Sequence, residues 1–321
     1  MRRKASRAAT PSRAAARSCS DCTTSGGSAT AGALVTDVPR TDAEINALFG
    51  SGSHLAMIAR AYRSVNTRTN VDALPLADNG SGTAATASVA FSGTATGAGK
   101  LYVTIVSKEL HTYELDVNTG DAAATLGTNL LAAINADRYL PFTAALSTAT
   151  VTCTAASKGT HANDWLLSYK GTVPGITVTL TGWTSGATNP ALTTLFDPIG
   201  VIRYQSIVWP ACYDVTKIQV FLDARKNVNN NIMDGMAFTY QNLPFSSIKT
   251  LASTTNSSEV VLFNNEPTSS STWIGPHIPE APDCIAAKIA AAFDLRLEPG
   301  AVISPEVVTN APLDQFGGPR S

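Results

Sequence analysis

Residues 47–62, ALFGSGSHLAMIARAY, predict the end of one helix and the start of another. The apolar residues before Gly50 have helical spacing from Asp42 onward, and the glycine ends that helix. Ser53 suits the cap of the second helix, because a serine hydroxyl accepts a hydrogen bond from a backbone N–H two or three residues further on. The apolar face of the second helix consists of Leu55, Ile58, Ala59, Tyr62 and Val65. A strand is predicted at 70–77, so this region starts an α/β domain.

The glycines between these helices also resemble a loop that binds phosphate at a helix N-terminus. A helix rather than a strand leads into them, however, and no G-x-G-x-x-G pattern is present, so a structural turn is the favoured interpretation. A second Gly-rich stretch, GTATGAGKL at 93–101, has Leu101 where a phosphate-binding P-loop needs Ser or Thr. It lies between two predicted strands, and it therefore predicts a hairpin turn.

Thr, Gly and Ala dominate the chain from residue 78 to about residue 190, and apolar residues alternate with polar ones there. This two-residue period predicts strands at 85–93, 100–107, 111–117, 149–157, 164–171 and 175–183. One helix is predicted within the region, at 122–135. The pattern is typical of an all-β sandwich or barrel-like domain.

Strands and helices alternate again after residue 190. The predicted strands lie at 204–210, 235–240 and 259–264, and the predicted helices start at Asp214, follow Pro244 and span 279–297. The inward residues of the last helix are predicted to be Ile285, Ile289, Phe293 and Leu297. This alternation predicts a mixed, largely parallel sheet with helices on its faces.

The predicted fold class is therefore an α/β core that carries an inserted all-β sandwich or barrel-like domain. The core is expected to combine residues 28–77 with 191–321, and the insertion spans 78–190. Residues 1–27 lack hydrophobic periodicity and are predicted to be disordered.

Charge is sparse and unevenly distributed. Only 15% of the residues are charged, against about 25% in a typical globular chain. Residues 1–30 hold six of the 23 basic groups and one of the 24 acidic groups, which leaves 17 basic and 23 acidic groups, a net charge of −6, in the rest. A mildly acidic body offers no broad nucleic-acid footprint. The Thr-rich, low-charge surface suits either a protein covered by its neighbours or an all-β domain that uses Thr for strand propensity.

No catalytic, cofactor-binding or metal-binding residue is predicted. Five scattered cysteines indicate a reducing compartment, and the Cys19–Cys22 pair lacks the partners of a zinc or redox site. The four histidines occur in no ligand or nucleophile motif, although a Ser–His–Asp site ignores sequence order. Three aromatic residues near strand ends form either a ligand wall or, more commonly, core packing: Tyr204, Trp209 and Trp273. No apolar run reaches the 18 residues of a membrane span.

Four segments, in order along the chain, resemble the tail sheath proteins of contractile-tailed bacteriophages. They are SATAGALVTDVPRTDAEINALFGSGSHLAMIARAYRSVN, then GTAATASVAFSGTATGAGKLYVTI with AASKGTHAN, then FDPIGVIRYQSIVWPACYD, and finally IPEAPDCIAAKIAAAFDLRLEPG. The resemblance implies a subunit of a helical tube around an inner tail tube. It also implies a core fold similar to that of subtilisin without the protease machinery, a β-sandwich insertion, and terminal arms that add strands to neighbouring subunits.

The resemblance carries further expectations about assembly. The partners would be other copies of the chain, the inner tail tube protein, and the baseplate and tail terminator proteins, with no nucleic acid, membrane or cofactor. The location would be the virion tail sheath, assembled in the host cytoplasm. Both chain ends depart from the family pattern: residues 1–27 suggest a wrongly assigned or out-of-frame start, and a C-terminal domain is expected to be missing after QFGGPRS.

Three alternatives remain open from the sequence. The chain is also compatible with the sheath of a secretion system or bacteriocin particle, as a related structural alternative to the phage sheath. A different class is a β-sandwich adhesin or binding module on an α/β scaffold. A hydrolase with a spatially assembled Ser–His–Asp site is the third class, and it predicts labelling by an active-site serine probe.

Overall fold

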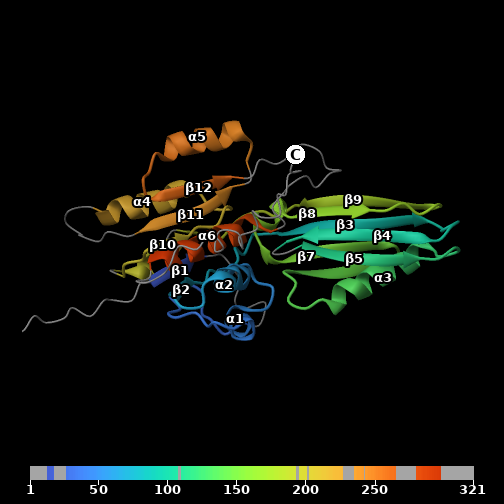
Figure 1. The fold of residues 1–321 in the computed structure, drawn as a ribbon, viewed down its shortest axis with the longest axis horizontal. Coiled ribbons are helices and arrows are strands. Elements are labelled where there is room, and N and C mark those ends of the chain that lie inside the picture. The colour runs from blue at the N-terminus through green and yellow to red at the C-terminus, as the bar shows by residue number, and fades with distance from the viewer. Residues whose placement is uncertain are drawn as a thin grey trace, which may run out of the picture.

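The computed structural model describes residues 13–17, 27–107, 110–192, 195–200, 202–226, 235–241, 243–264 and 280–297. The fold is mixed α/β, with one parallel sheet flanked by helices and two antiparallel sheets (Figure 1). The parallel sheet lies at one end of the elongated molecule and the antiparallel sheets at the other (Figure 1). Within the described ranges, no helix has both the length and the apolar character needed to cross a membrane.

The parallel sheet has the strand order β12-β11-β10-β1-β2, and every neighbouring pair in it is parallel. Its strands are β1 (Arg13–Arg17), β2 (Asn70–Leu74), β10 (Ser206–Val208), β11 (Met236–Gln241) and β12 (Val260–Asn264). A single antiparallel bridge between Val35 and Ala73 adds to the β2 edge. The largely parallel sheet predicted from the alternation of strands and helices is thus confirmed.

The strand β1 corrects one prediction. Residues 13–17 belong to the segment that was predicted to be disordered, yet they pair with β10 on one side and β2 on the other. A strand between two neighbours hydrogen-bonds along both edges, and that gain depends on residues far away in the sequence rather than on its own composition. The other residues before Gly27 lie outside the described residues.

Helices lie on both faces of the parallel sheet (Figure 1). They are α1 (Asp42–Phe49), α2 (His54–Val65), α4 (Val215–Lys226), α5 (Phe245–Thr255) and α6 (Pro282–Leu297). One face packs on α2 and α6 through residues such as Ala73 and Phe238. The other packs on α4 through residues such as Ile207 and Trp209. Neighbouring residues of one strand, such as Ala237 and Phe238, therefore pack on opposite faces, as expected for a sheet that helices bury on both sides.

The buried face of α6 differs from the predicted one. Ile285 is buried as predicted, but Ile289 and Phe293 are only partly buried, and the side chain of Leu297 lies outside the described residues. The fully buried residues are instead Cys284, Ala286, Ala287, Ala290, Ala291 and Asp294. Alanines let α6 approach α2 closely, since small side chains shorten the distance between helix axes.

The antiparallel part has a four-stranded sheet, β6-β7-β3-β9, and a three-stranded sheet, β5-β4-β8. Its elements are β3 (Ala84–Gly93), β4 (Gly99–Val106), β5 (Leu110–Val117), α3 (Ala123–Ala136), β6 (Phe142–Ser147), β7 (Thr150–Lys158), the short 3-10 helix η1 (His161–Asp164), β8 (Leu166–Lys170) and β9 (Ile176–Thr184). All six predicted strands and the predicted helix are present. The strand β6 was not among the predicted strands, and only its Phe142 is fully buried.

The Gly-rich stretch at 93–101 is not a hairpin turn, which corrects a second prediction. Strands β3 and β4, which it joins, belong to different sheets, so the chain crosses from one sheet to the other. Thr94 forms a bridge with Ala122, and Gly99 lies against Val173, which leaves a Cβ at position 99 only 3.0 Å from that side chain. Gly99 therefore allows the chain to pack closely against the side chain of Val173.

The predicted cap of α2 is confirmed: the backbone N–H of Ala56 donates to the Ser53 hydroxyl oxygen over 3.2 Å. Replacing Ser53 with alanine removes this acceptor, and we expect a loss of about 1 kcal/mol in the free energy of unfolding. Urea unfolding of the two proteins tests this. A Ser51→Ala variant, at an exposed position of the same turn, is the control and is expected to unfold like the wild type.

Candidate functional site

A buried histidine–aspartate pair lies where the helical part meets the antiparallel part. His54 is the first residue of α2, and its side chain is 1% exposed. Its Nε2 lies 2.7 Å from Oδ2 of Asp283, in the first turn of α6. The other oxygen of Asp283 accepts a hydrogen bond of 2.6 Å from the backbone N–H of Ala211, which follows β10. The pair therefore ties α2, α6 and the end of β10 together.

Residues of the antiparallel part complete this cluster. The ring of His161 stacks on the ring of His54 with centroids 4.3 Å apart, and Trp165 meets His161 edge-on. The hydroxyl oxygen of Ser157, at the end of β7, accepts a hydrogen bond of 3.3 Å from the backbone N–H of His54. We call His54, Ser157, His161 and Asp283 the histidine joint. The contacts of His54 with Ser157 and His161 hold the two parts of the fold together, and the contact of His54 with Asp283 joins residues 229 positions apart in sequence.

The histidine joint contains the residue types of a serine hydrolase but not their arrangement. In such an enzyme one imidazole nitrogen faces the carboxylate and the other faces the serine hydroxyl. Here the Ser157 oxygen is bound to a backbone N–H, and Nδ1 of His54 is buried without a hydrogen-bond partner among the described residues. Ser157 is itself 2% exposed, so an external substrate has no route to its hydroxyl. The geometry supports a packing contact.

Burial lowers the pKa of His161 well below its ordinary value, and the neighbouring His54 adds to the effect. The groups around this ring come from α2, α6 and β7: the titratable ring of His54, the Asp283 carboxyl group behind His54, and the backbone of Lys158, which binds the His161 ring. A histidine that burial keeps neutral takes up its proton at a lower pH in the folded protein than in the unfolded chain. The stability it contributes is therefore present above the ordinary pKa of about 6.5 and is lost as the pH falls below it.

We accordingly expect the protein to lose stability on acidification from pH 7 to pH 5, by up to about 1.4 kcal/mol per pH unit from this group. Urea unfolding at several pH values measures the slope. The variant His161→Phe keeps an aromatic ring but cannot titrate, so its slope in this range is expected to be shallower. An unchanged slope would show that other groups cause the pH dependence.

The turn that precedes α2 packs against the antiparallel part at Gly52, while Ser51 is exposed. Gly50 and Gly52 have φ angles of 88° and 77°, which favour glycine. A Cβ at Gly52 would lie 2.5 Å from the carbonyl oxygen of Leu140. Two backbone N–H groups in the first turn of α2 are already bound, that of His54 by Ser157 and that of Ala56 by Ser53. These contacts favour the structural turn over a phosphate loop.

Replacing Gly52 with alanine is expected to lower the free energy of unfolding by about 2 kcal/mol, because the substitution combines an unfavourable φ with a backbone clash. Thermal unfolding followed by circular dichroism tests this. Gly80→Ala is the matched control, since nothing lies within 4 Å of a Cβ there. Equal melting temperatures for both variants would contradict the close approach at Gly52.

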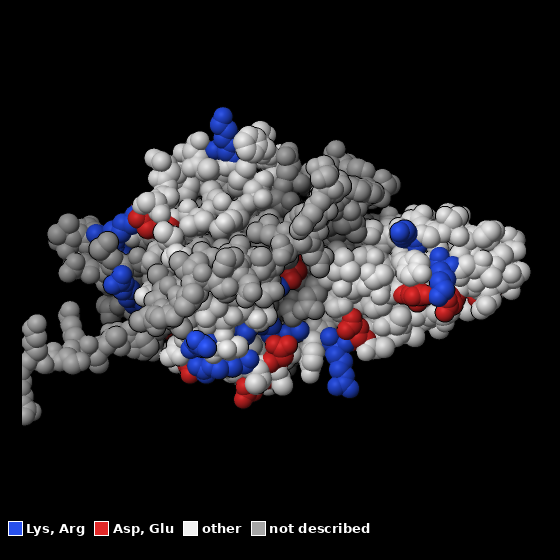
Figure 2. Space-filling view, viewed as in Figure 1, with Lys and Arg blue, Asp and Glu red and all other residues white. Residues whose placement is uncertain are grey.

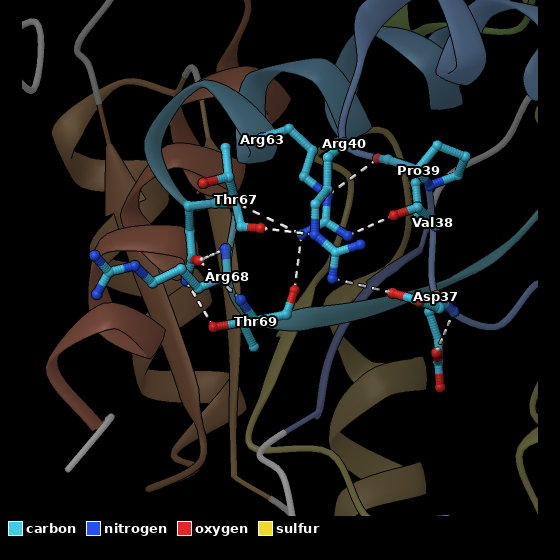
Figure 3. A network of polar contacts seen from close by, with 10 residues as sticks. Asp37, Val38, Pro39, Arg40, Arg63, Thr67, Arg68 and Thr69 are labelled. Atoms are coloured by element: carbon cyan, nitrogen blue, oxygen red, sulfur yellow. Dashed lines mark hydrogen bonds and ion pairs between the residues drawn. The ribbon is translucent and has the colours of Figure 1, made fainter.

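A second polar cluster surrounds Arg63 in α2 (Figure 3). Its guanidinium is buried and donates to backbone carbonyl oxygens of Val38, Pro39 (3.2 Å) and Thr69 (2.7 Å), with a longer contact of 3.4 Å to Asn66. Burial and the nearby Arg40 lower the pKa of Arg63. The acceptors are all neutral carbonyls, so Arg63 fixes the segment before α1 and the turn after α2 in place.

The other aromatic and histidine residues considered from the sequence lie in the core or in local polar contacts where the structure describes them. Tyr204 and Trp209 are fully buried, which confirms core packing for these two, and the Tyr204 hydroxyl donates to Asp72 over 3.0 Å. His111 pairs with Asp137 in the antiparallel part, at 2.7 Å. The described part of the chain contains no group of three or more His, Cys, Asp or Glu residues placed to bind a metal ion. The residues Cys19, Cys22, Trp273 and His277 lie outside the described residues.

Comparison with known proteins gives one informative match. No protein-family model matches the chain. Over 173 residues, or 52% of its length, the chain is 32% identical to the Mu-like prophage FluMu tail sheath protein of Haemophilus influenzae. The aligned part is 35% of that relative, so the chain spans about a third of its length. Structural comparison aligns 91% of the chain with 60% of a sheath tail protein from Desulfitobacterium hafniense at 12% identity, but the TM-score of 0.36 is too low to support an argument.

Proposed function

We propose that this chain, which is homologous to a phage tail sheath protein over about half of its length, is a structural subunit of a contractile tail sheath. The identity of 32% over 173 residues is the observation that carries the proposal. It agrees with the resemblance that the four sequence segments showed. The homology is to a protein of structural and not catalytic role, and the geometry of the histidine joint supports the same conclusion.

We also propose a division of the chain into two domains. Residues 28–77 and 191–321, together with β1 at 13–17, would form the α/β core, and residues 78–190 would form an inserted β-sandwich. Two observations support this division. The strands of the parallel sheet come only from outside 78–190, whereas all strands of the antiparallel sheets come from inside it. The histidine joint and the contact of Gly52 with Leu140 would then lie between the two domains.

The proposed mechanism is mechanical. Copies of the chain would polymerise around the inner tail tube in an extended lattice and change to a contracted lattice during genome delivery. A two-state polymer of this kind draws its free energy from subunit contacts, so it needs no cofactor. The histidine joint suits such a role, because the ring stack of His54 on His161 and the hydrogen bond between His54 and Ser157 keep two domains in one orientation while the whole subunit rotates. The inner tube, baseplate and tail terminator proteins would be the partners, within a virion assembled in the host cytoplasm.

Electron microscopy of the full-length gene product, expressed with and without the inner tube protein of the same gene cluster, tests the proposal. Tubes of regular diameter are the expected result. A persistent monomer in both preparations would contradict it. Labelling by an active-site serine probe would instead support a hydrolase, and specific glycan binding without polymers would support an adhesin.

A further inference from the structure

The outward face of the four-stranded sheet carries small residues and, apart from Lys158 at the end of β7, no charge. The strand registers place these residues directly opposite one another, so that they form one continuous surface. We call it the hydroxyl face. It consists of Thr86, Ser88, Ala90 and Ser92 of β3, Thr143, Ala145 and Ser147 of β6, Thr150, Thr152 and Thr154 of β7, and Thr177, Thr179 and Thr181 of β9. These side chains are exposed or half-buried, whereas those on the inner face, such as Val89 and Val151, are buried.

No described helix covers the hydroxyl face. The helix α3 packs on the inner side of the sheet, where Gly127 meets the side chain of Leu146. The outer face of the three-stranded sheet is different, since Lys100 there forms ion pairs with Glu114 and Asp116. Figure 2 likewise shows the strand-rich end as largely uncharged, with its visible charges gathered in few places. The absence of charge is therefore a property of one sheet and not of the whole surface.

The two edge strands of this sheet lack charge as well. Neither β6 (FTAALS) nor β9 (ITVTLTGWT) contains a Lys, Arg, Asp, Glu or Pro residue. Edge strands of soluble proteins usually carry such residues because they prevent pairing with other chains. A face and two edges without charge are typical of a surface that another molecule covers.

We infer that the hydroxyl face is a self-association surface, on which two copies of this chain pair their four-stranded sheets face to face. Two arguments favour a second copy over another partner. The body outside residues 1–30 has a net charge of −6, so two identical copies repel each other least where no charge is present. A hydroxyl group both donates and accepts hydrogen bonds, so an array of hydroxyls is complementary to itself.

The inferred contact is two-fold, since the same surface is used by both copies. A two-fold contact closes on itself and forms a dimer, and it cannot generate a polar helical tube. The pair is therefore a state of the unpolymerised chain, and the inference does not depend on the proposed sheath function. Four strands about 4.8 Å apart and up to about 30 Å long offer on the order of 500 Å² per copy, below the roughly 800 Å² of a stable interface. The dimer is accordingly weak and reversible, and it forms at high protein concentration.

Sedimentation velocity of the full-length chain over a range of concentrations tests the inference. We expect a monomer–dimer equilibrium in the wild type and at least a tenfold weaker association in the double variant Thr152→Lys/Thr179→Lys, which sets like charges against each other. The matched control is Thr112→Lys, at an exposed position of the three-stranded sheet, and it is expected to associate like the wild type. Far-UV circular dichroism verifies that all three proteins fold.

Cross-linking gives a second, independent measurement. In a background with Cys19, Cys22 and Cys212 replaced by serine, Thr152→Cys is expected to form a dimer with a short bismaleimide. Thr112→Cys in that background and the background protein, with its buried Cys153 and Cys284, are not expected to. A wild type that stays monomeric at every soluble concentration would overturn the inference, and so would equal association of the lysine double variant. Tube formation by the same variant with the inner tube protein reports separately on the sheath function.

Discussion

The variant Asp283→Ala is expected to lose about 3–5 kcal/mol of unfolding free energy, a large part of the 5–15 kcal/mol typical of a domain. The substitution removes the acceptor of both the buried His54 ring and the half-buried Ala211 backbone N–H, and both donors lose this partner. A buried polar group that loses its partner costs more than the hydrogen bond itself contributes. Urea unfolding at pH 7.5 measures the loss.

Two control variants show whether the loss of stability comes from the contacts of the Asp283 carboxylate or from replacing any aspartate at a helix start. Asp283→Asn retains an acceptor oxygen for one of the two donors, and we expect an intermediate loss of stability. Asp214→Ala removes an exposed aspartate whose side chain accepts a hydrogen bond from the Thr216 backbone N–H at the start of another helix, and it is expected to cost about 1 kcal/mol, as the loss of a helix cap does. A loss for Asp283→Ala as small as that for Asp214→Ala would mean that the histidine joint contributes little to the fold.

The variant Arg63→Met is expected to be comparably unstable, with a loss of about 3–5 kcal/mol. Methionine fills a similar volume but donates no hydrogen bond, so the carbonyl oxygens of Val38, Pro39 and Thr69 lose their partner (Figure 3). Each buried carbonyl that loses its partner costs about 1–3 kcal/mol. Thermal and urea unfolding of the full-length chain measure the effect.

Arg68 provides the matched control, because it lies in the same turn and its side chain is exposed. Arg68→Met is expected to change the unfolding free energy by less than about 0.5 kcal/mol. In Arg63→Lys a single ammonium cannot reach the same set of carbonyls, so this variant should fall between the wild type and Arg63→Met. Equal stability of Arg63→Met and Arg68→Met would contradict the structural role of the buried guanidinium.

Local patterns predicted most of the fold because each depends on neighbouring residues. The two-residue period located six strands of the antiparallel part, and helical spacing located the five helices around the parallel sheet. The end of α1 at Gly50 and the cap of α2 at Ser53 followed from the conformational freedom of glycine and the acceptor of serine. The strand β6 was missed because its alternation contains too few large apolar residues.

The candidate site could not be predicted in the same way. His54 and Asp283 lie 229 residues apart, and each is an isolated polar residue within an ordinary helix start. No catalytic or ligand-binding motif therefore contains both residues, and only the packing of α2 against α6 brings the two side chains together. The hydroxyl face is an intermediate case. The Thr-rich strands were visible in the sequence, but the strand order decides that their outward residues form one surface.

The sequence by itself determined the types and approximate limits of the elements, the parallel character of one sheet and the resemblance to tail sheath proteins. These follow from periodicity, caps and ordered segments, which short-range physics controls. Only the tertiary structure decided that residues 13–17 become an interior strand of the parallel sheet, that alanines rather than isoleucines form the deepest face of α6, and that a histidine pair joins the two parts. Each of these outcomes depends on hydrogen bonds or burial supplied by distant residues, so no local pattern contains them.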